Sequence, residues 1–141
     1  PVVELWLSSS TSDAGVCAYL EEIDTAGKAV VRADGRLRAS HRAIGTAAYD
    51  YLGLPYHRSF RVDPQPLQPD EPVPLLFDLV PTSTIVKAGS RLRLVVAGAD
   101  SRQRMGPPST PPPRLTVYTG GEKASYISLP VIPSGTSRIA P

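Results

Sequence analysis

The chain has 141 residues, of which 41% are hydrophobic and 20% are charged, a composition typical of a globular protein with a single core. Fifteen basic and thirteen acidic side chains leave a formal net charge of +2. That surplus is too small to indicate a nucleic-acid partner, which usually requires a clustered basic face. No apolar run approaches the roughly 18 residues of a membrane-spanning helix, so we expect no membrane partner either.

The cysteine count and the first residue bear on the compartment and on completeness. A single cysteine, Cys17, excludes an internal disulfide and a cysteine-based zinc cage. We expect it to be a small buried hydrophobe in a strand, which fits a reducing compartment and predicts a cytoplasmic protein. The chain begins at Pro1 without a methionine, which predicts a piece of a longer protein, so the absence of a leader carries little meaning.

The first forty residues contain four expected strands. Sixteen prolines and eleven glycines interrupt the chain, and the short segments between them are rich in Val, Leu, Ile and Tyr, the pattern of an all-β fold. The turn sequence DTAG at 24–27 and a second Asp-Gly at 34–35 favour chain reversals. The expected strands are 2–8, 16–23, 28–33 and 34–40.

The middle of the chain differs from its two ends. Residues 43–60 contain three tyrosines without a period of two, which indicates a long structured loop. Residues 62–72 contain four prolines and cannot form a regular ladder, because proline lacks the N–H donor. Residues 101–113 form a polar, proline-rich loop. The remaining strands are expected at 73–79, within 81–100 after a turn at Ala88-Gly89, at 114–120 and at 124–132.

Eight or nine short strands with two long crossings predict a two-sheet jelly-roll sandwich, an all-β fold that covers its own edges. We expect one β-sandwich domain over residues 1–133 and a mobile tail over 134–141. Period-two alternation assigns one large apolar residue of each of five strands to a core between the sheets. These residues are Leu5, Leu20, Phe77, Leu94 and Val117.

The segment 37–43 (LRASHRA) places a serine directly beside a histidine. If a strand continues through it, Ser40 and His41 point to opposite faces and cannot share the short hydrogen bond that a nucleophile and its base require. The same alternation gathers three guanidinium groups on one strand face: Arg36, Arg38 and Arg42. We therefore expect strand surface here and no catalytic pair.

Other patterns that could carry chemistry are also missing. His41 and His57 are the only histidines and have no neighbouring cluster of Cys, Asp or Glu, so no metal site is expected. No G-x-S-x-G nucleophile elbow and no nucleotide-binding glycine motif occurs. Glu21 and Glu22 are adjacent and should face opposite sides of a strand, unlike a glycosidase pair. The sequence thus predicts no catalytic residue, no metal and no cofactor.

Four runs of the chain together resemble one known family. They are DGRLRASHRA (34–43), YDYLGLPYHRSF (49–60), FDLVPTSTIVKAGSRLRLVVAGAD (77–100) and TVYTGGEKASYISLPVIP (116–133). The P-T-S…K-A-G-x-R-L-R-L unit with the terminal L-P-V-I-P makes the likeness specific. The chain resembles the C-terminal domain of the X-Pro dipeptidyl-peptidase, cocaine esterase and α-amino acid ester hydrolase family, also called CocE/NonD hydrolases.

The resemblance implies a galactose-binding-like jelly roll that follows an α/β-hydrolase domain in the same chain. In the family the catalytic serine, aspartate and histidine belong to that upstream domain, so no catalytic residue is carried over to this sequence. The parent protein is then expected to be a serine hydrolase with dipeptidyl-peptidase or esterase activity. This domain would pack on the hydrolase domain and help shape its active-site entrance, or form a contact in a homo-oligomer.

The sequence also offers candidates for that contact. Arginine and aromatic residues are enriched in protein–protein interfaces, and an apolar loop suits a neighbouring domain better than open solvent. The candidate inter-domain residues are Arg36, Arg38, Arg42, Tyr51, Leu52, Leu54 and Tyr56.

Two other functions stay open. One is a carbohydrate-binding module, because jelly rolls often bind sugars and exposed aromatics stack on sugar rings. The candidates for such stacking are Trp6, Tyr49, Tyr51 and Tyr56. The other is an independent small enzyme, which the missing catalytic constellation disfavours.

Overall fold

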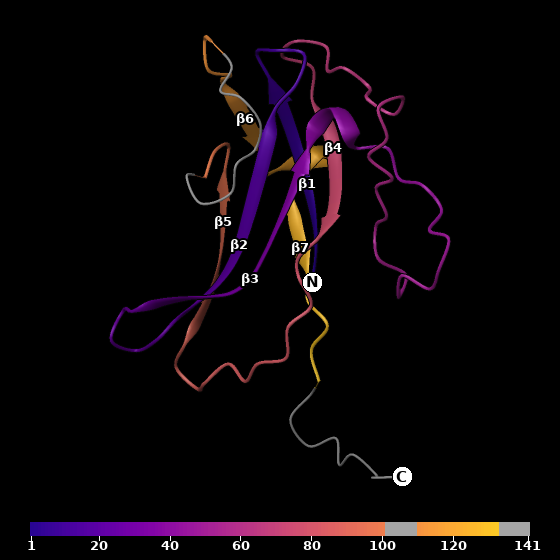
Figure 1. Ribbon diagram of the computed structural model, residues 1–141. Coiled ribbons are helices and arrows are strands. Elements are labelled where there is room, and N and C mark those ends of the chain that lie inside the picture. The colour runs from indigo at the N-terminus through magenta and orange to yellow at the C-terminus, as the bar shows by residue number, and fades with distance from the viewer. Residues whose placement is uncertain (101–109, 133–141) are drawn as a thin grey trace.

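The computed structural model describes residues 1–100 and 110–132 (Figure 1). These residues form strands joined by loops and two short 3₁₀ helices, which confirms the all-β class. In chain order the elements are β1 (Val2–Ser9), β2 (Gly15–Ile23), β3 (Ala29–Arg38), η1 (Ala39–His41), β4 (Val73–Asp78), β5 (Arg91–Ala97), β6 (Leu115–Tyr118), η2 (Gly121–Lys123) and β7 (Tyr126–Ser128).

The described strands form two antiparallel sheets that face each other as a sandwich (Figure 1). In one sheet β1 is central, with β4 on one side and β6 and β7 on the other. In the other sheet β2 is central, between β3 and β5. β1 alternates in burial and turns Val3, Leu5 and Leu7 toward the core between the sheets, whereas β2 is continuously apolar and buried on both faces over residues 16–20.

Seven strands are found in the described part of the chain, where the sequence predicted eight or nine. One reason is that Asp34 and Gly35 do not form a turn: β3 runs without a break from Ala29 to Arg38. A register shift at Leu20/Glu21 opposite this strand marks a β-bulge. The Asp-Gly pair thus lies inside a bent strand, since tertiary pairing has overridden its turn propensity.

The core lies between the sheets, as expected. Leu5, Leu20 and Phe77 are buried in one apolar cluster, and Leu94 is partly buried and packs against it. The prediction for Val117 is wrong, because its side chain is 37% exposed. Val117 pairs with the buried Leu7, but β6 is a four-residue strand at the edge of its sheet, so a neighbouring strand covers only one of its sides.

The two sheets approach most closely where β3 meets β4. The Val80 N–H donates to the Asp34 carbonyl oxygen at 2.8 Å. A Cβ atom on Gly35 would lie 2.4 Å from the Asp78 carbonyl oxygen and 2.8 Å from Leu79 Cδ2. Only glycine therefore fits at position 35 without displacing the backbone of β4.

Near the hairpin between β2 and β3, a buried carboxylate joins three segments. Glu22 on β2 is 4% exposed and accepts hydrogen bonds from Arg32 Nε and Nη2 at 3.0 and 2.6 Å. The Lys87 N–H in the crossover between β4 and β5 donates to its other oxygen at 3.2 Å. Hydrogen bonds from Ser90, Arg32 and the Lys87 N–H lower the pKa of Glu22 to about 2. The β-bulge in β3 allows the Arg32–Glu22 ion pair to form. Arg32 is the extra residue of the bulge, because it lies between Ala33 and Val31, which pair with Leu20 and Glu21.

Cys17 is fully buried on β2, as predicted. Burial raises the pKa of its thiol, and both the loss of thiolate and the loss of access slow its reaction with electrophiles. We expect native protein to react with a thiol reagent on the order of a hundredfold more slowly than unfolded protein. Stopped-flow labelling with and without denaturant measures this, and equal rates in the two states would show that the thiol is accessible.

Two expectations lie outside the described residues: the mobile tail at 134–141 and most of the polar loop at 101–113. Across residues 1–100 and 110–132, no helix has the length and apolar character needed to cross a membrane.

Candidate functional site

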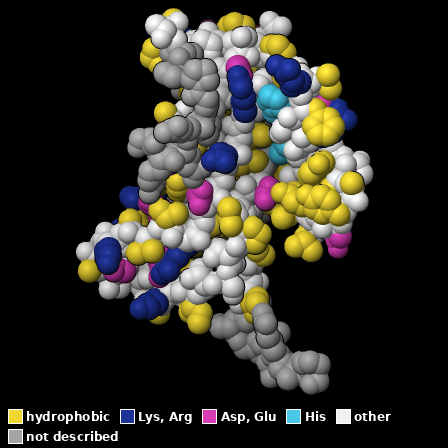
Figure 2. Space-filling view, in the orientation of Figure 1, with side chains coloured by type: hydrophobic (Ala, Val, Ile, Leu, Met, Phe, Trp, Pro, Cys, Tyr) yellow, Lys and Arg dark blue, Asp and Glu magenta, His cyan; other side chains and the backbone are white. Residues whose placement is uncertain are grey.

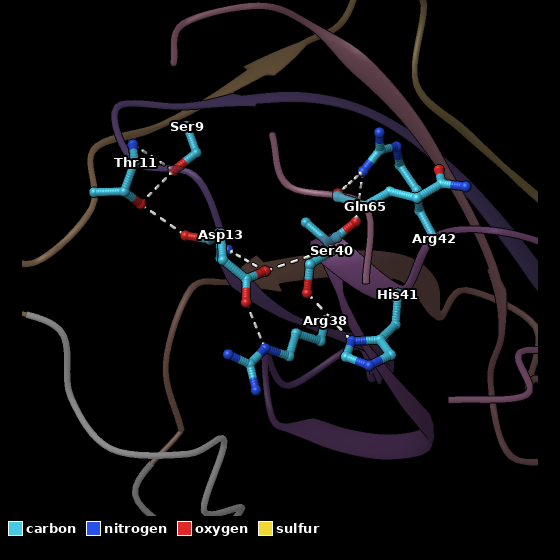
Figure 3. Close-up of polar contacts among 10 residues, drawn as sticks. Ser9, Thr11, Asp13, Arg38, Ser40, His41, Arg42 and Gln65 are labelled. Carbon is cyan, nitrogen blue, oxygen red and sulfur yellow. Dashed lines mark hydrogen bonds and ion pairs between the residues drawn. The ribbon is translucent and has the colours of Figure 1, made fainter. Parts of the chain in front are cut away.

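Ser40 and His41 lie side by side, contrary to the prediction. The strand ends at Arg38, and Ala39–His41 forms the 3₁₀ helix η1. The tighter backbone turns the two side chains toward each other, and Ser40 Oγ lies 3.2 Å from His41 Nδ1 (Figure 3). Neighbouring side chains point to opposite faces only on a strand, and Ser40 and His41 lie on a 3₁₀ helix.

This pair nevertheless lacks the arrangement of a catalytic dyad. Ser40 is 4% exposed, so a substrate has little access to its hydroxyl group. Asp13, the nearby carboxylate, accepts a hydrogen bond from the Ser40 backbone N–H at 3.0 Å and another from Arg38 Nε (Figure 3). A triad would instead require the carboxylate to orient the histidine.

Asp13 is the centre of a structural network. Burial raises the pKa of its carboxyl group, but hydrogen bonds from Arg38 and Ser40 outweigh that effect and lower it overall. The Ala39 N–H donates to the Ala14 carbonyl oxygen at 2.8 Å, next to these contacts. The charged Asp13 therefore fastens the β1–β2 connection to the end of β3 and helps to fix the position of η1.

A groove of about 580 Å³ opens beside this network. Its walls come from β3, η1, β4 and the 43–60 segment. It gathers four of the seven predicted contact residues: Arg36, Arg38, Tyr51 and Tyr56. His41, His57 and Asp78 also line it, and Figure 2 shows the histidines next to the apolar patches of the same face.

The other three predicted contact residues lie outside the lining of the groove. Arg42 follows η1 and does not share a strand face with Arg36 and Arg38, which corrects that prediction. Its Nη1 donates to the carbonyl oxygens of Ala39 and Gln65 (Figure 3). Leu52 is 77% exposed, and Leu54 is half-buried.

The 43–60 segment is an ordered loop without regular strands, as predicted. The rings of Tyr49, Tyr51 and Tyr56 meet edge to face, with centroids 5.6–6.2 Å apart. The Gly45 N–H donates to the Tyr56 carbonyl oxygen at 2.8 Å. Burial and the nearby Asp78 raise the pKa of the Tyr51 hydroxyl.

His57 joins this loop to β4. Its Nε2 lies 2.8 Å from the Leu76 carbonyl oxygen, and its Nδ1 lies 3.1 Å from the Ala43 carbonyl oxygen. Sequence reasoning considered His57 only as a metal ligand and missed this role, which depends on backbone atoms far away in the chain. Within the described residues, no group of three His, Cys, Asp or Glu side chains could hold a metal ion.

Large apolar side chains are exposed along the same loop and just beyond it. Such a concentration on an ordered segment marks a surface that suits a protein neighbour. The exposed side chains are Ile44, Tyr49, Leu52, Phe60 and Val62.

The two antiparallel sheets, with the groove at one side, define a β-sandwich domain. Residues 1–128 match the family described as the X-Pro dipeptidyl-peptidase C-terminal non-catalytic domain. The chain belongs to this family.

Similar proteins agree with this assignment. Proteins of Mycobacterium bovis and Mycobacterium tuberculosis, each named "putative serine esterase", are 38% identical over 132 residues, or 93% of this chain. The chain spans about a fifth (21%) of the length of these relatives.

Two crystal structures of a CocE/NonD family hydrolase from Staphylococcus aureus are similar in fold. One has a TM-score of 0.61 and 28% identity and covers 70% of this chain and 19% of that chain. The other has a TM-score of 0.66 and 24% identity and covers 88% of this chain and 26% of that chain. The chain is thus similar to a part of a CocE/NonD family hydrolase that makes up about a fifth to a quarter of that protein.

Proposed function

We propose that this domain belongs to a serine hydrolase of the esterase or dipeptidyl-peptidase type and packs against the α/β-hydrolase domain of the same chain. The contact face comprises the groove and the 43–60 loop, and through it the domain helps to shape the active-site entrance. A jelly-roll, galactose-binding-like topology, a homo-oligomeric contact and a cytoplasmic location are further parts of this proposal.

One observation carries the proposal: the 43–60 loop is ordered although much of its apolar surface is uncovered. Its tyrosines stack on one another and His57 ties it to β4, yet Leu52 and Phe60 remain exposed. An ordered apolar surface gains free energy when a neighbouring domain covers it. Contacts between domains within one chain typically bury roughly 600–1,500 Å².

The test is a double substitution, Tyr51→Ser with Leu54→Ser. We expect the 141-residue chain to remain folded, because neither side chain belongs to the core cluster between the sheets. In the parent hydrolase the same pair should lower the melting temperature by several degrees, since apolar contact area between the domains is lost. Differential scanning calorimetry and ester-hydrolysis kinetics of the parent measure the effect.

A matched control is Ile85→Ser with Val131→Ser, which removes exposed apolar side chains outside the groove. This pair should leave the parent's melting temperature within about a degree of wild type. If the two double variants behave alike, the loop is ordinary surface and the docking role is refuted.

The carbohydrate-binding alternative has weaker support. Three of its four aromatic candidates, Tyr49, Tyr51 and Tyr56, meet edge to face with interplanar angles of 75–85°. Rings packed in this way do not form the flat, open platform on which a sugar ring stacks. Retention of the isolated domain on a polysaccharide column would revive this function.

A further inference from the structure

Arg38 is bonded differently from Arg32, Arg58 and Arg93: like Arg114, which contacts Asp70 through Nη2, it contacts its carboxylate through a single donor. Arg32, Arg58 and Arg93 each use both Nε and Nη2 on a single partner, which are Glu22, Asp63 and Glu21. Such two-point pairing occupies one edge of the guanidinium fork.

Arg38 instead contacts Asp13 through Nε (Figure 3). Both of its Nη groups lack an acceptor among the described residues, and its side chain is 60% exposed. Asp13 is itself fixed by the Ser40 and Ala14 N–H groups at 3.0 and 2.9 Å. The guanidinium is therefore held through Nε by a fixed carboxylate, while its Nη groups make no hydrogen bond to the residues that the structure describes.

Arg38 also lines the groove, together with His41. His41 uses Nδ1 toward Ser40, and its Nε2 makes no hydrogen bond to the residues at 1–100 and 110–132. A guanidinium fork that is held in place matches the geometry of a carboxylate, which can accept two parallel N–H bonds. Asp78 also lines the groove, on the β4 side, but its carboxylate only accepts hydrogen bonds, so it does not bind a second carboxylate as the Arg38 guanidinium can.

We infer that the groove receives an aspartate or glutamate side chain of the upstream hydrolase domain, which binds the Nη groups of Arg38. This inference rests on the proposed docking function and specifies the chemistry of the partner. Asp13 is a positioning residue in this arrangement, because it orients the guanidinium and does not contact the partner.

The test uses the intact parent chain carrying Arg38→Lys and a zero-length carbodiimide cross-linker. The reagent joins an amine to a carboxylate only where the two are in contact, so peptide mass spectrometry identifies the partner. We expect a cross-link from the new amine to an Asp or Glu upstream of this domain, at several-fold higher yield than from Arg93→Lys. Arg93, which is bound at two points by Glu21, is the matched control.

A second variant, Arg38→Gln, keeps the test independent of the shorter reach of lysine. It should lower the parent's melting temperature by more than Arg93→Gln does, and the difference should shrink in 1 M NaCl. A cross-link to Asp13 alone, or no cross-link together with equal effects of the two glutamine variants, overturns the inference. If Tyr51→Ser with Leu54→Ser still destabilises the parent, docking stands and only the carboxylate partner is wrong.

Discussion

Gly35→Ala should be among the most damaging single substitutions in this domain, with a loss of about 3 kcal/mol or more in the free energy of unfolding. The new Cβ would lie 2.4 Å from the Asp78 carbonyl oxygen and 3.1 Å from Leu79 Cα. These are backbone atoms, which cannot rotate away as the end of a flexible side chain does. To relieve the clash, β3 and β4 must separate, which breaks the bond from the Val80 N–H to the Asp34 carbonyl oxygen.

Gly120→Ala is the control for the change in backbone entropy. Gly120 has an extended backbone (φ −149°, ψ 168°), and a Cβ there would meet nothing within 4 Å. Alanine at this position should be neutral or stabilising by up to about 1 kcal/mol, because it restricts the unfolded chain. Urea unfolding followed by circular dichroism compares the two variants. Equal midpoints would mean that β3 and β4 can move apart freely.

Much of the sandwich was predictable from the sequence because β1, β2 and β4 follow simple rules. Alternation along each strand assigned Leu5, Leu20 and Phe77 to the core, and all three are buried. A period of two reports which face a residue occupies, and it does so without knowledge of the neighbouring strand. The rule does not predict the exposure of Val117, because the exposure of a residue on an edge strand depends on what lies beside that strand.

The errors around the site have a common physical origin. The sequence prediction extended a strand through Ser40, whereas the chain turns there into η1. The turn is fixed by Asp13, which lies 27 residues away from Ser40 in the chain. Long-range hydrogen bonds of this kind leave no local pattern in the sequence, so the Ser40–His41 contact could not be found from periodicity.

The groove was partly predictable for a different reason. Residue type, together with a shared strand face for Arg36 and Arg38 and a shared loop for Tyr51 and Tyr56, selected these contact candidates, and the fold places all four around one groove. His57 and Asp78 complete it, but their positions depend on how the loop lies against β4. Composition therefore indicated the kind of surface, and only the tertiary structure defines its walls.

Glu22→Gln should have the other large effect, a fall of roughly 5–10 °C in melting temperature at neutral pH. The amide keeps the size of the side chain but removes the charge that Arg32, Ser90 and the Lys87 N–H stabilise. It also leaves the Arg32 guanidinium without its counter-ion in a partly buried position. The crossover between β4 and β5 should loosen with it, because that segment is bound to the same carboxylate.

The Glu22 carboxylate also makes the stability of the domain depend on pH. Its pKa in the folded protein is about 2, below the ordinary value of 4.5, so the unfolded chain binds a proton more readily than the folded one. The stabilisation is therefore complete above about pH 4.5 and is lost as the pH falls toward 2. Melting temperatures measured between pH 6 and pH 2 should converge for wild type and Glu22→Gln as the pH falls.

Glu21→Gln separates this effect from the loss of any charge on β2. Glu21 is the adjacent residue and pairs with Arg93 at 2.6 Å, where the arginine side chain is half exposed. Such pairs contribute little, about 0–1 kcal/mol, because water and salt screen them. This control retains Glu22 and should therefore retain both the neutral melting temperature and the acid-dependent loss. If Glu21→Gln and Glu22→Gln instead melt alike at every pH, the buried carboxylate does not hold the end of the sandwich together.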